Sequence, residues 1–378
     1  MACKVSRALL LRPRVLCYTA ARMASSSSEV SFLQTDKVGR ITLDRQRALN
    51  AINSGMVADI TKQLLDWRQS DDVDVVCIEG AGDKAFCAGG DVVSITRDAD
   101  SPNVPLDFFY KEFQMNHLIG TYPKTYIALI HGITMGGGVG LSVHGKYRVA
   151  TDRSLYAMPE TAIGYFPDVG GSFFLSRLPQ PYGMFLGLTG HRLKGCDLKH
   201  LGIATHYTHS ENLAALKRDI VSSDKHSISE VLSKHDCEPP SPFTLEPHHD
   251  FITSCFSGAG NVSEIITRLK DHSSSTTSSE FAGKLLSSLS RMSPRSLVVT
   301  HKLLTLAPSM SYEECFAMEF NAAQEIVRSG EFNEGVRALL VDKDNSPKWD
   351  PPTLEAVTEE MVEGYFVKRE PTWQPLDL

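Results

Sequence analysis

Two glycine turns in this 378-residue chain place backbone N–H groups where they could act on a carbonyl group. The first turn contains Gly89 and Gly90, and the second contains Gly136, Gly137 and Gly138. N–H groups at the start of a helix point outward with partial positive charge, and glycine lets a ligand approach them closely. Either turn alone is typical of a tight strand-to-helix connection. Together they indicate an oxyanion hole, in which N–H groups stabilise an oxygen that becomes negative.

Two acids lie downstream of these turns, Glu160 and Asp168, within the segment AMPETAIGYFPDVGG at residues 157–171. An acid in a loop is usually solvated. A carboxylate that faces inward can have a shifted pKa and act as a base or a nucleophile. An inward-facing loop is expected here because several of its other side chains are apolar or aromatic, namely Met158, Ile163, Tyr165 and Phe166.

Other chemical templates for a glycine-rich segment do not fit the sequence. A dinucleotide-binding turn requires G-x-G-x-x-G with an acid about 20 residues later, and neither glycine turn has that spacing. The segment GLSVHGKY approaches a P-loop, but Tyr147 stands where a magnesium-binding hydroxyl is required. The chain contains no G-x-S-x-G, H-E-x-x-H or C-x-x-C motif, so it predicts no serine nucleophile elbow and no metal site.

The elements that must position these residues follow an α/β pattern up to about residue 200. Apolar or alternating segments predict strands at residues 38–45, 73–80, 126–130, 147–150 and 155–158. A helix is expected after the capping residue Asn53 or Ser54, because apolar side chains recur at helical spacing at Met56, Ile60, Leu64 and Trp67. Helical patterns then dominate, most clearly at residues 264–269, 283–289 and 312–327, with a polar loop at 272–280 and a proline break at 238–243.

The composition restricts the class of protein and its compartment. A net charge of −7 does not favour binding to nucleic acid, and no apolar run approaches the ~20 residues that span a membrane. Residues 1–28 contain no acid, and their five basic residues are interleaved with leucine and valine and followed by four serines at residues 25–28. This is typical of a mitochondrial transit peptide, so a location in the mitochondrial matrix is expected.

The segments AFCAGGD and HGITMGGGVGL, in this order, resemble the two oxyanion-hole segments of the crotonase (enoyl-CoA hydratase/isomerase) superfamily. The resemblance extends from Val38 into the C-terminal region. It implies an α/β fold with a crotonase-like (ClpP/crotonase-like) ββα spiral core at residues 29–205 and a helical region of the same unit at residues 206–378. It also implies an acyl-CoA substrate, in which coenzyme A takes the place of any separate cofactor, and a possible homo-oligomer such as a trimer.

The resemblance assigns roles residue by residue. Gly90 and Gly137 match the two oxyanion donors, and Glu160 matches the catalytic glutamate. Asp168 matches a second acid near the substrate, and Glu112, in the segment YKEFQMNHL, matches a substrate-contacting acid. Expected substrate contacts are therefore made by Glu112, Gly137, Glu160 and Asp168. Lys84 and the turn at residues 48–51 are candidates for contacts to coenzyme A.

Position 140 separates two activities within the superfamily. Hydratases carry a second catalytic glutamate two places beyond the glycine triplet, where this chain has Gly140. The segments at residues 131–145, 158–171 and 342–349, in this order, resemble the branch that hydrolyses hydroxyacyl-CoA thioesters, which implies 3-hydroxyisobutyryl-CoA as the substrate, in valine breakdown. Glu160 would attack the carbonyl group or activate water. The alternatives are an enoyl-CoA hydratase or isomerase, and a non-catalytic acyl-CoA-binding homologue.

Overall fold

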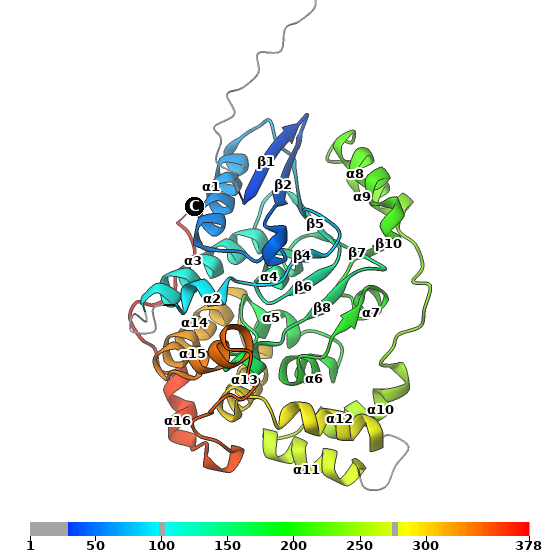
Figure 1. Cartoon of the computed structure of the whole chain (residues 1–378). Coiled ribbons are helices and arrows are strands. Elements are labelled where there is room, and N and C mark those ends of the chain that lie inside the picture. Colours follow the sequence, from blue (N-terminus) through cyan, green and yellow to red (C-terminus); the bar gives the residue numbers. More distant parts are fainter. Residues whose placement is uncertain (1–28, 98–102, 274–278, 378) are drawn as a thin grey trace, which may run out of the picture.

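The computed structural model of the chain describes residues 29–97, 103–273 and 279–377, so the predicted transit peptide at residues 1–28 lies outside the described residues. Its largest element is a six-stranded sheet (Figure 1). The first two strands are antiparallel, and every other neighbouring pair is parallel. The strands in spatial order are β1 (Val30–Thr35), β2 (Val38–Leu43), β3 (Val75–Gly80), β5 (Thr125–Ile130), β7 (Tyr147–Thr151) and β10 (His206–Thr208).

The chain also forms a second, four-stranded sheet. Its strands in spatial order are β4 (Ala85–Cys87), β6 (Ile133–Met135), β8 (Leu155–Ala157) and β9 (Leu193–Lys194). β4, β6 and β8 each come directly after a strand of the large sheet, and they are parallel to one another. The chain therefore repeats a turn of two strands followed by a helix, which is the ββα spiral expected from the sequence.

Helices in the first half of the chain cover the sheets. α1 (Ser54–Gln69) begins where Asn53 accepts a hydrogen bond from the Met56 N–H at 3.0 Å, and its buried side chains include the four that predicted it. The others that bear on the site are α2 (Val92–Ile95), α3 (Asn103–Gly120), α4 (Gly137–Val143), α5 (Gly171–Leu175), α6 (Tyr182–Thr189) and α7 (Gly195–His200).

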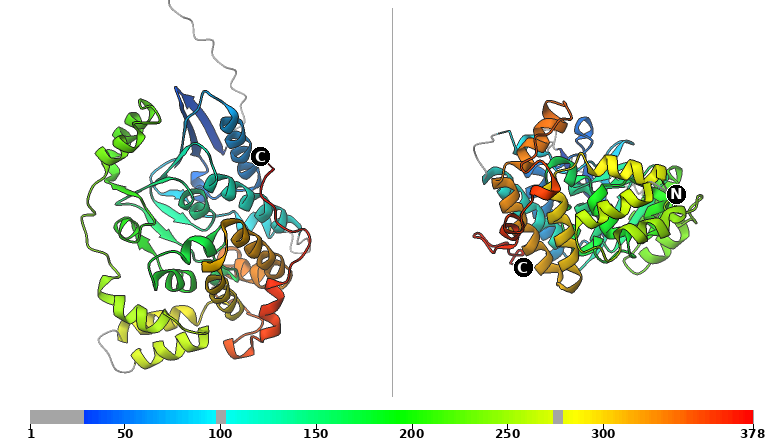
Figure 2. Two further views of the ribbon diagram at one scale, coloured as in Figure 1. Left: turned by 180° about the vertical axis from the view of Figure 1, so that it is seen from behind. Right: turned by 90° about the horizontal axis from the view of Figure 1, so that it is seen from below.

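Beyond β10, which lies just past the expected end of the core at residue 205, the described chain consists of helices and loops and contains no further strand. The helices are α8 (Leu213–Val221), α9 (Ile228–His235), α10 (His249–Phe256), α11 (Val262–Ser273), α12 (Ser279–Leu289), α13 (Pro294–Leu306), α14 (Tyr312–Arg328), α15 (Glu331–Val336) and α16 (Glu359–Glu363). Figure 2 shows the C-terminal end returning to the side of the spiral, where Gln114 of α3 donates a hydrogen bond to the Gln374 carbonyl. No helix among the described residues is long and apolar enough to cross a bilayer.

The strands and helices predicted from sequence patterns are present, with ends shifted by a few residues. The predicted loop at 272–280 contains residues 274–278, which lie outside the described part, and residues 238–243 form no helix or strand. The sequence patterns did not predict β1, whose side chains are mostly exposed and whose pairing with β2 extends the sheet.

Candidate active site

The two glycine turns and the acidic loop meet because of the order of strands in the small sheet. Gly90 comes shortly after the end of β4, Gly137 after β6, and Glu160 after β8. These three strands are parallel neighbours, so their carboxyl ends lie at one edge of the sheet. That edge is where ligands bind in open parallel sheets. The order of the strands thus brings these three segments together. Their spacing in the sequence alone did not predict this.

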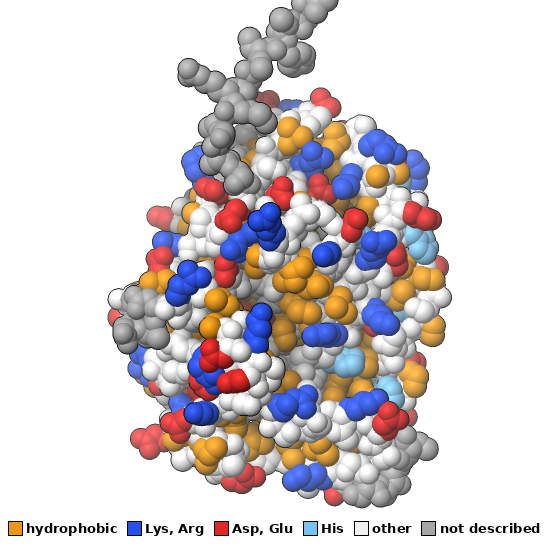
Figure 3. All heavy atoms as spheres, viewed as in Figure 1, with side chains coloured by type: hydrophobic (Ala, Val, Ile, Leu, Met, Phe, Trp, Pro, Cys, Tyr) orange, Lys and Arg blue, Asp and Glu red, His pale blue; other side chains and the backbone are white. Residues whose placement is uncertain are grey.

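A cavity of about 400 Å³ opens at this edge. All five residues that the sequence assigned to the site line it: Gly90, Glu112, Gly137, Glu160 and Asp168. Most of the remaining wall is apolar or aromatic and includes Phe108, Phe109, Ile163, Tyr165, Phe332, Leu339 and Leu340. On the face of the molecule seen in Figure 3, apolar side chains gather near the centre, and basic side chains lie around them.

The backbone N–H groups of Gly90 and Gly137 both lie at the cavity, and neither has an acceptor among the described residues. Ile52 donates to the Gly89 carbonyl at 2.9 Å and accepts from the Asp91 N–H at 2.7 Å, so the N–H of Gly90 between them faces away from Ile52. Gly137 is the first residue of α4, whose first N–H groups lack intrahelical partners. A methyl group on Gly137 would lie 3.2 Å from the Gly90 nitrogen. The two donors are therefore close neighbours.

The carboxyl groups of Glu112 and Glu160 lie against the second glycine turn. Gly136 has a φ of +48°, and a methyl group there would lie 2.8 Å from Glu160 Oε1. A methyl group on Gly137 would collide with Glu112 Oε1. Glycine at these positions lets both acids approach the backbone donors.

Burial dominates the electrostatics of the three acids. Their exposed fractions are 2% for Glu112, 6% for Glu160 and 5% for Asp168. Burial raises the pKa of Glu112 and of Glu160 to about 8, and the charge of Glu112 contributes to the rise at Glu160. Burial and the charges of Glu112 and Glu160 raise the pKa of Asp168 well above its ordinary value. The cavity therefore disfavours simultaneous ionisation of all three and can hold protons near neutral pH.

The loop that carries Asp168 is held by a buried acid from α14. Glu319 accepts hydrogen bonds from the Gly170 N–H at 2.8 Å, the Ser172 N–H at 2.8 Å and the Ser172 hydroxyl at 2.5 Å. Val169, between them and Asp168, has a φ of +53°, which is rare for a β-branched residue. The His144 side chain donates from Nε2 to the Val169 carbonyl at 2.7 Å. These contacts fix an otherwise unfavourable turn beside the cavity.

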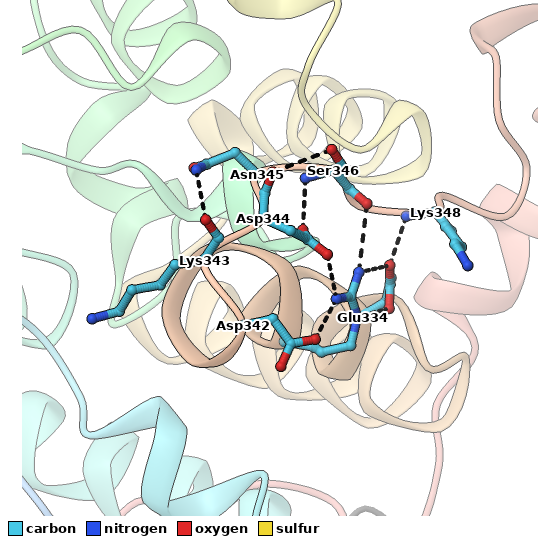
Figure 4. A network of polar contacts seen from close by, with 8 residues as sticks. Glu334, Asp342, Lys343, Asp344, Asn345, Ser346 and Lys348 are labelled. Atoms are coloured by element: carbon cyan, nitrogen blue, oxygen red, sulfur yellow. Dashed lines mark hydrogen bonds and ion pairs between the residues drawn. The ribbon is translucent and has the colours of Figure 1, made fainter.

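A second network holds the wall formed by Leu339 and Leu340, which lies in a π-helical turn at Arg337–Val341. Arg337 donates to both carboxylate oxygens of Glu334 at 2.8 Å, to Asp342 at 2.6 Å and to Asp344 at 2.7 Å (Figure 4). The backbone N–H of Lys348 also donates to Glu334 at 2.7 Å. The network ties the segment at residues 342–349 to the turn that closes one side of the cavity.

Sequence reasoning missed Glu319 and Arg337. Glu319 lies on the buried face of a predicted helix, three positions after Phe316, so an acid on an apolar stripe was the available signal. Arg337 gave only the signal of an acid three positions earlier, Glu334, because its other partners, Asp342 and Asp344, come from a loop. Lys84 and the turn at residues 48–51, the candidates for contacts to coenzyme A, lie together at a different hollow of about 470 Å³.

Fold and site define the class of protein. A family model described as enoyl-CoA hydratase/isomerase matches residues 38–366, and the chain belongs to this family. Proteins named "3-hydroxyisobutyryl-CoA hydrolase, mitochondrial" from Danio rerio and Homo sapiens are each 46% identical to it. The alignments cover 91% and 92% of this chain and 90% of each relative. The resemblance found in the sequence is thereby confirmed.

Solved structures agree with the fold. A carnitinyl-CoA dehydratase from Mycobacterium thermoresistibile superposes with a TM-score of 0.85 at 36% identity, over 92% of this chain and 98% of that one. An enoyl-CoA hydratase from Rhodobacter sphaeroides superposes with a TM-score of 0.84 at 34% identity, over 92% of this chain and 100% of that one.

Proposed function

We propose that the protein hydrolyses the thioester of 3-hydroxyisobutyryl-CoA to 3-hydroxyisobutyrate and free coenzyme A, a step of valine breakdown. The observation that carries the proposal is the cavity that brings the unpaired N–H groups of Gly90 and Gly137 together with the buried carboxyl group of Glu160. The names of relatives with 46% identity over about nine-tenths of the chain support this substrate. Coenzyme A is part of the substrate, and the proposal includes no separate cofactor.

The carbonyl oxygen of the thioester lies between the N–H groups of Gly90 and Gly137. When the carbonyl carbon becomes tetrahedral, the oxygen gains negative charge and both hydrogen bonds strengthen. Interactions that strengthen in the transition state lower the barrier, and each donor contributes about 10²–10³ in rate.

Glu160 supplies the attacking group in one of two ways. In the first, a Glu160 oxygen forms a bond to the carbonyl carbon, the carbon–sulfur bond breaks, and the thiolate leaves with the bonding electrons. Water then cleaves the resulting anhydride. In the second, Glu160 takes a proton from water as the water oxygen bonds to the carbonyl carbon, and the carbon–sulfur bond then breaks so that the thiolate leaves with the bonding electrons. Asp168 orients the substrate hydroxyl or assists proton transfer, and Glu112 contacts the substrate.

Position 140 favours hydrolysis over hydration of an enoyl group. A methyl group on Gly140 would lie 2.5 Å from Asn116 Oδ1 and 2.7 Å from Val169 Cβ. The space beside this residue is therefore filled by α3 and by the loop that carries Asp168. The second glutamate expected of a hydratase is absent from this position, and no side chain fits there.

The test follows thiol release from 3-hydroxyisobutyryl-CoA by the protein without residues 1–28. The wild type should release thiol, and Glu160→Gln should lose at least about a thousandfold in kcat while keeping its circular dichroism spectrum. Hydroxylamine added during turnover distinguishes the two routes, because it traps an anhydride at Glu160 as a hydroxamate. Full activity of Glu160→Gln would overturn the role of Glu160. Loss of crotonyl-CoA absorbance without thiol release would instead indicate a hydratase.

The proposal also covers the compartment in which the protein acts and its oligomeric state. The acid-free, basic segment at residues 1–28 and the mitochondrial names of the relatives support import into the mitochondrion, with the matrix as the compartment. The mature chain is proposed to form a homo-oligomer, which sedimentation at several concentrations would measure.

The basic side chains around the apolar centre in Figure 3 suit a ligand with an apolar arm and charged phosphates.

A further inference from the structure

A tyrosine on the acidic loop is held rigidly at the cavity. The ring of Tyr165 stacks on Phe166 at 4.5 Å and on Phe109 at 4.9 Å, with interplanar angles of 16° and 20°. Its backbone N–H donates to the Glu160 carbonyl at 3.0 Å. The side chain is 2% exposed and lines the same cavity as Glu160 and Asp168. The ring therefore cannot turn away from the site without disturbing two aromatic contacts.

The hydroxyl group of this tyrosine is buried and has no hydrogen-bond partner among the described residues. Buried hydroxyl groups are nearly always paired, because leaving one unpaired is unfavourable. Burial, together with the charges of Asp168 and Glu112, raises the pKa of Tyr165 well above its ordinary value, so the group stays a protonated donor. The wall of the cavity thus includes a fixed tyrosine whose hydroxyl group lacks a partner among the described residues.

The walls of the cavity indicate what the missing partner is. Three buried acids disfavour an anionic acyl group, and Arg192, the only cation among the described residues of the lining, is exposed. Phe109 and Phe332 form apolar walls that offer no hydrogen bond. A neutral hydroxyl group on the acyl chain is both donor and acceptor, so it can accept from Tyr165 and donate to Asp168.

We propose that Tyr165 pairs with the hydroxyl group of the acyl chain and makes the site selective for hydroxyacyl thioesters over the same thioesters without the hydroxyl group. The inference rests on the proposed function, because it names what that site recognises. A site that hydrogen-bonds a substrate hydroxyl group rejects an analogue lacking it, since its own polar groups are then left buried and unpaired.

The test compares kcat/KM for 3-hydroxyisobutyryl-CoA and isobutyryl-CoA in the wild type and in Tyr165→Phe. The wild type should prefer the hydroxylated substrate by about tenfold or more. Tyr165→Phe keeps the stacked ring, and the preference should fall by about tenfold. Tyr207→Phe is the matched control, because Tyr207 is a fully buried tyrosine of β10 that is not part of the cavity wall. It should keep the wild-type preference.

Equal kcat/KM for the two substrates in the wild type would overturn the inference. So would an unchanged preference in a folded Tyr165→Phe protein. If that variant does not fold, binding of non-hydrolysable thioethers with and without the hydroxyl group to the wild type decides the matter. The hydroxylated thioether should bind about tenfold more tightly, and equal binding would count against Tyr165. If the wild type hydrolyses neither thioester, the proposed function is wrong. The thioether comparison would still test whether the site recognises the hydroxyl group.

Discussion

Gly140 and Val169 touch so closely that a methyl group on the glycine would lie 2.7 Å from the valine Cβ. Gly140 belongs to α4, whose first residue is Gly137, and Val169 follows Asp168 in the acidic loop. The close approach therefore packs α4, which begins at the proposed donor Gly137, against the loop that carries Asp168. A side chain at position 140 and the observed position of this loop exclude each other.

Substituting Gly140 should destabilise the protein. Alanine is favoured over glycine within a helix by about 1 kcal/mol, but the contacts with Asn116 and Val169 outweigh this gain. Overpacking of this kind typically costs about 1–3 kcal/mol, so we expect Gly140→Ala to lower the free energy of unfolding by about 2 kcal/mol in urea denaturation. Gly140→Glu should be less stable still and should not gain hydration of crotonyl-CoA.

Gly283→Ala serves as the control for helix propensity. Gly283 lies within α12, and a methyl group there would meet no atom within 4 Å. The substitution should stabilise the protein by about 0.5–1 kcal/mol. If Gly140→Ala stabilised the protein by the same amount, α4 and the loop that carries Asp168 could move apart without a loss of stability.

Replacing Glu319 should reduce activity through the position of Asp168. The two oxygens of Glu319 accept from two N–H groups and one hydroxyl group, whereas Glu319→Gln turns one oxygen into a donor that faces a donor. We expect a loss of about 2 kcal/mol in the free energy of unfolding and a fall in kcat on the order of tenfold. Ser172→Ala removes only the hydroxyl contact and should have a smaller effect on both. Unchanged kcat in Glu319→Gln would show that Asp168 does not need this anchor.

Local sequence patterns were sufficient to predict the elements that position the site. The spacing of Met56, Ile60 and Leu64 after Asn53 predicts α1, because these side chains share one face and the cap precedes them. The continuous apolar runs of β3 and β5 predict strands that are covered on both sides. The glycine turns and the acidic loop were also recognisable as segments.

Contacts between distant segments were not predictable in the same way. The meeting of Gly90, Gly137 and Glu160 depends on strands of three residues each, which are too short to show a periodic pattern. Glu319 binds a backbone group 149 residues earlier in the chain, and nothing in either segment indicates the other. The resemblance to a known family supplied what the patterns could not.

Weakening the Arg337 network should loosen the cavity wall. Arg337→Gln removes the ionic contacts to Glu334, Asp342 and Asp344, and Leu339 and Leu340 lie in the same turn. Because these pairs are partly exposed, the loss of stability should be modest, about 1 kcal/mol. The KM for 3-hydroxyisobutyryl-CoA should rise by about threefold to tenfold with a smaller change in kcat.

Lys343→Gln is the charge-matched control for Arg337→Gln. The ammonium group of Lys343 points away from the network in Figure 4. The control should therefore keep the wild-type KM. An equal rise in KM in both variants would attribute the effect to net charge near the cavity rather than to the wall.

The buried acids should make the protein less stable as the pH rises. The pKa values of Glu112 and Glu160 go from an ordinary 4.5 to about 8 on folding, so between these values the native state holds protons that the unfolded chain releases. Stability then falls with pH across this window, by at most about 1.4 kcal/mol per pH unit for each acid. Urea unfolding from about pH 5 to about pH 9 measures the slope, which Glu112→Gln should make shallower. Glu359→Gln, on the exposed α16, should keep the wild-type slope, and a wild-type stability that is flat or rising over this window would contradict the raised pKa values of these acids.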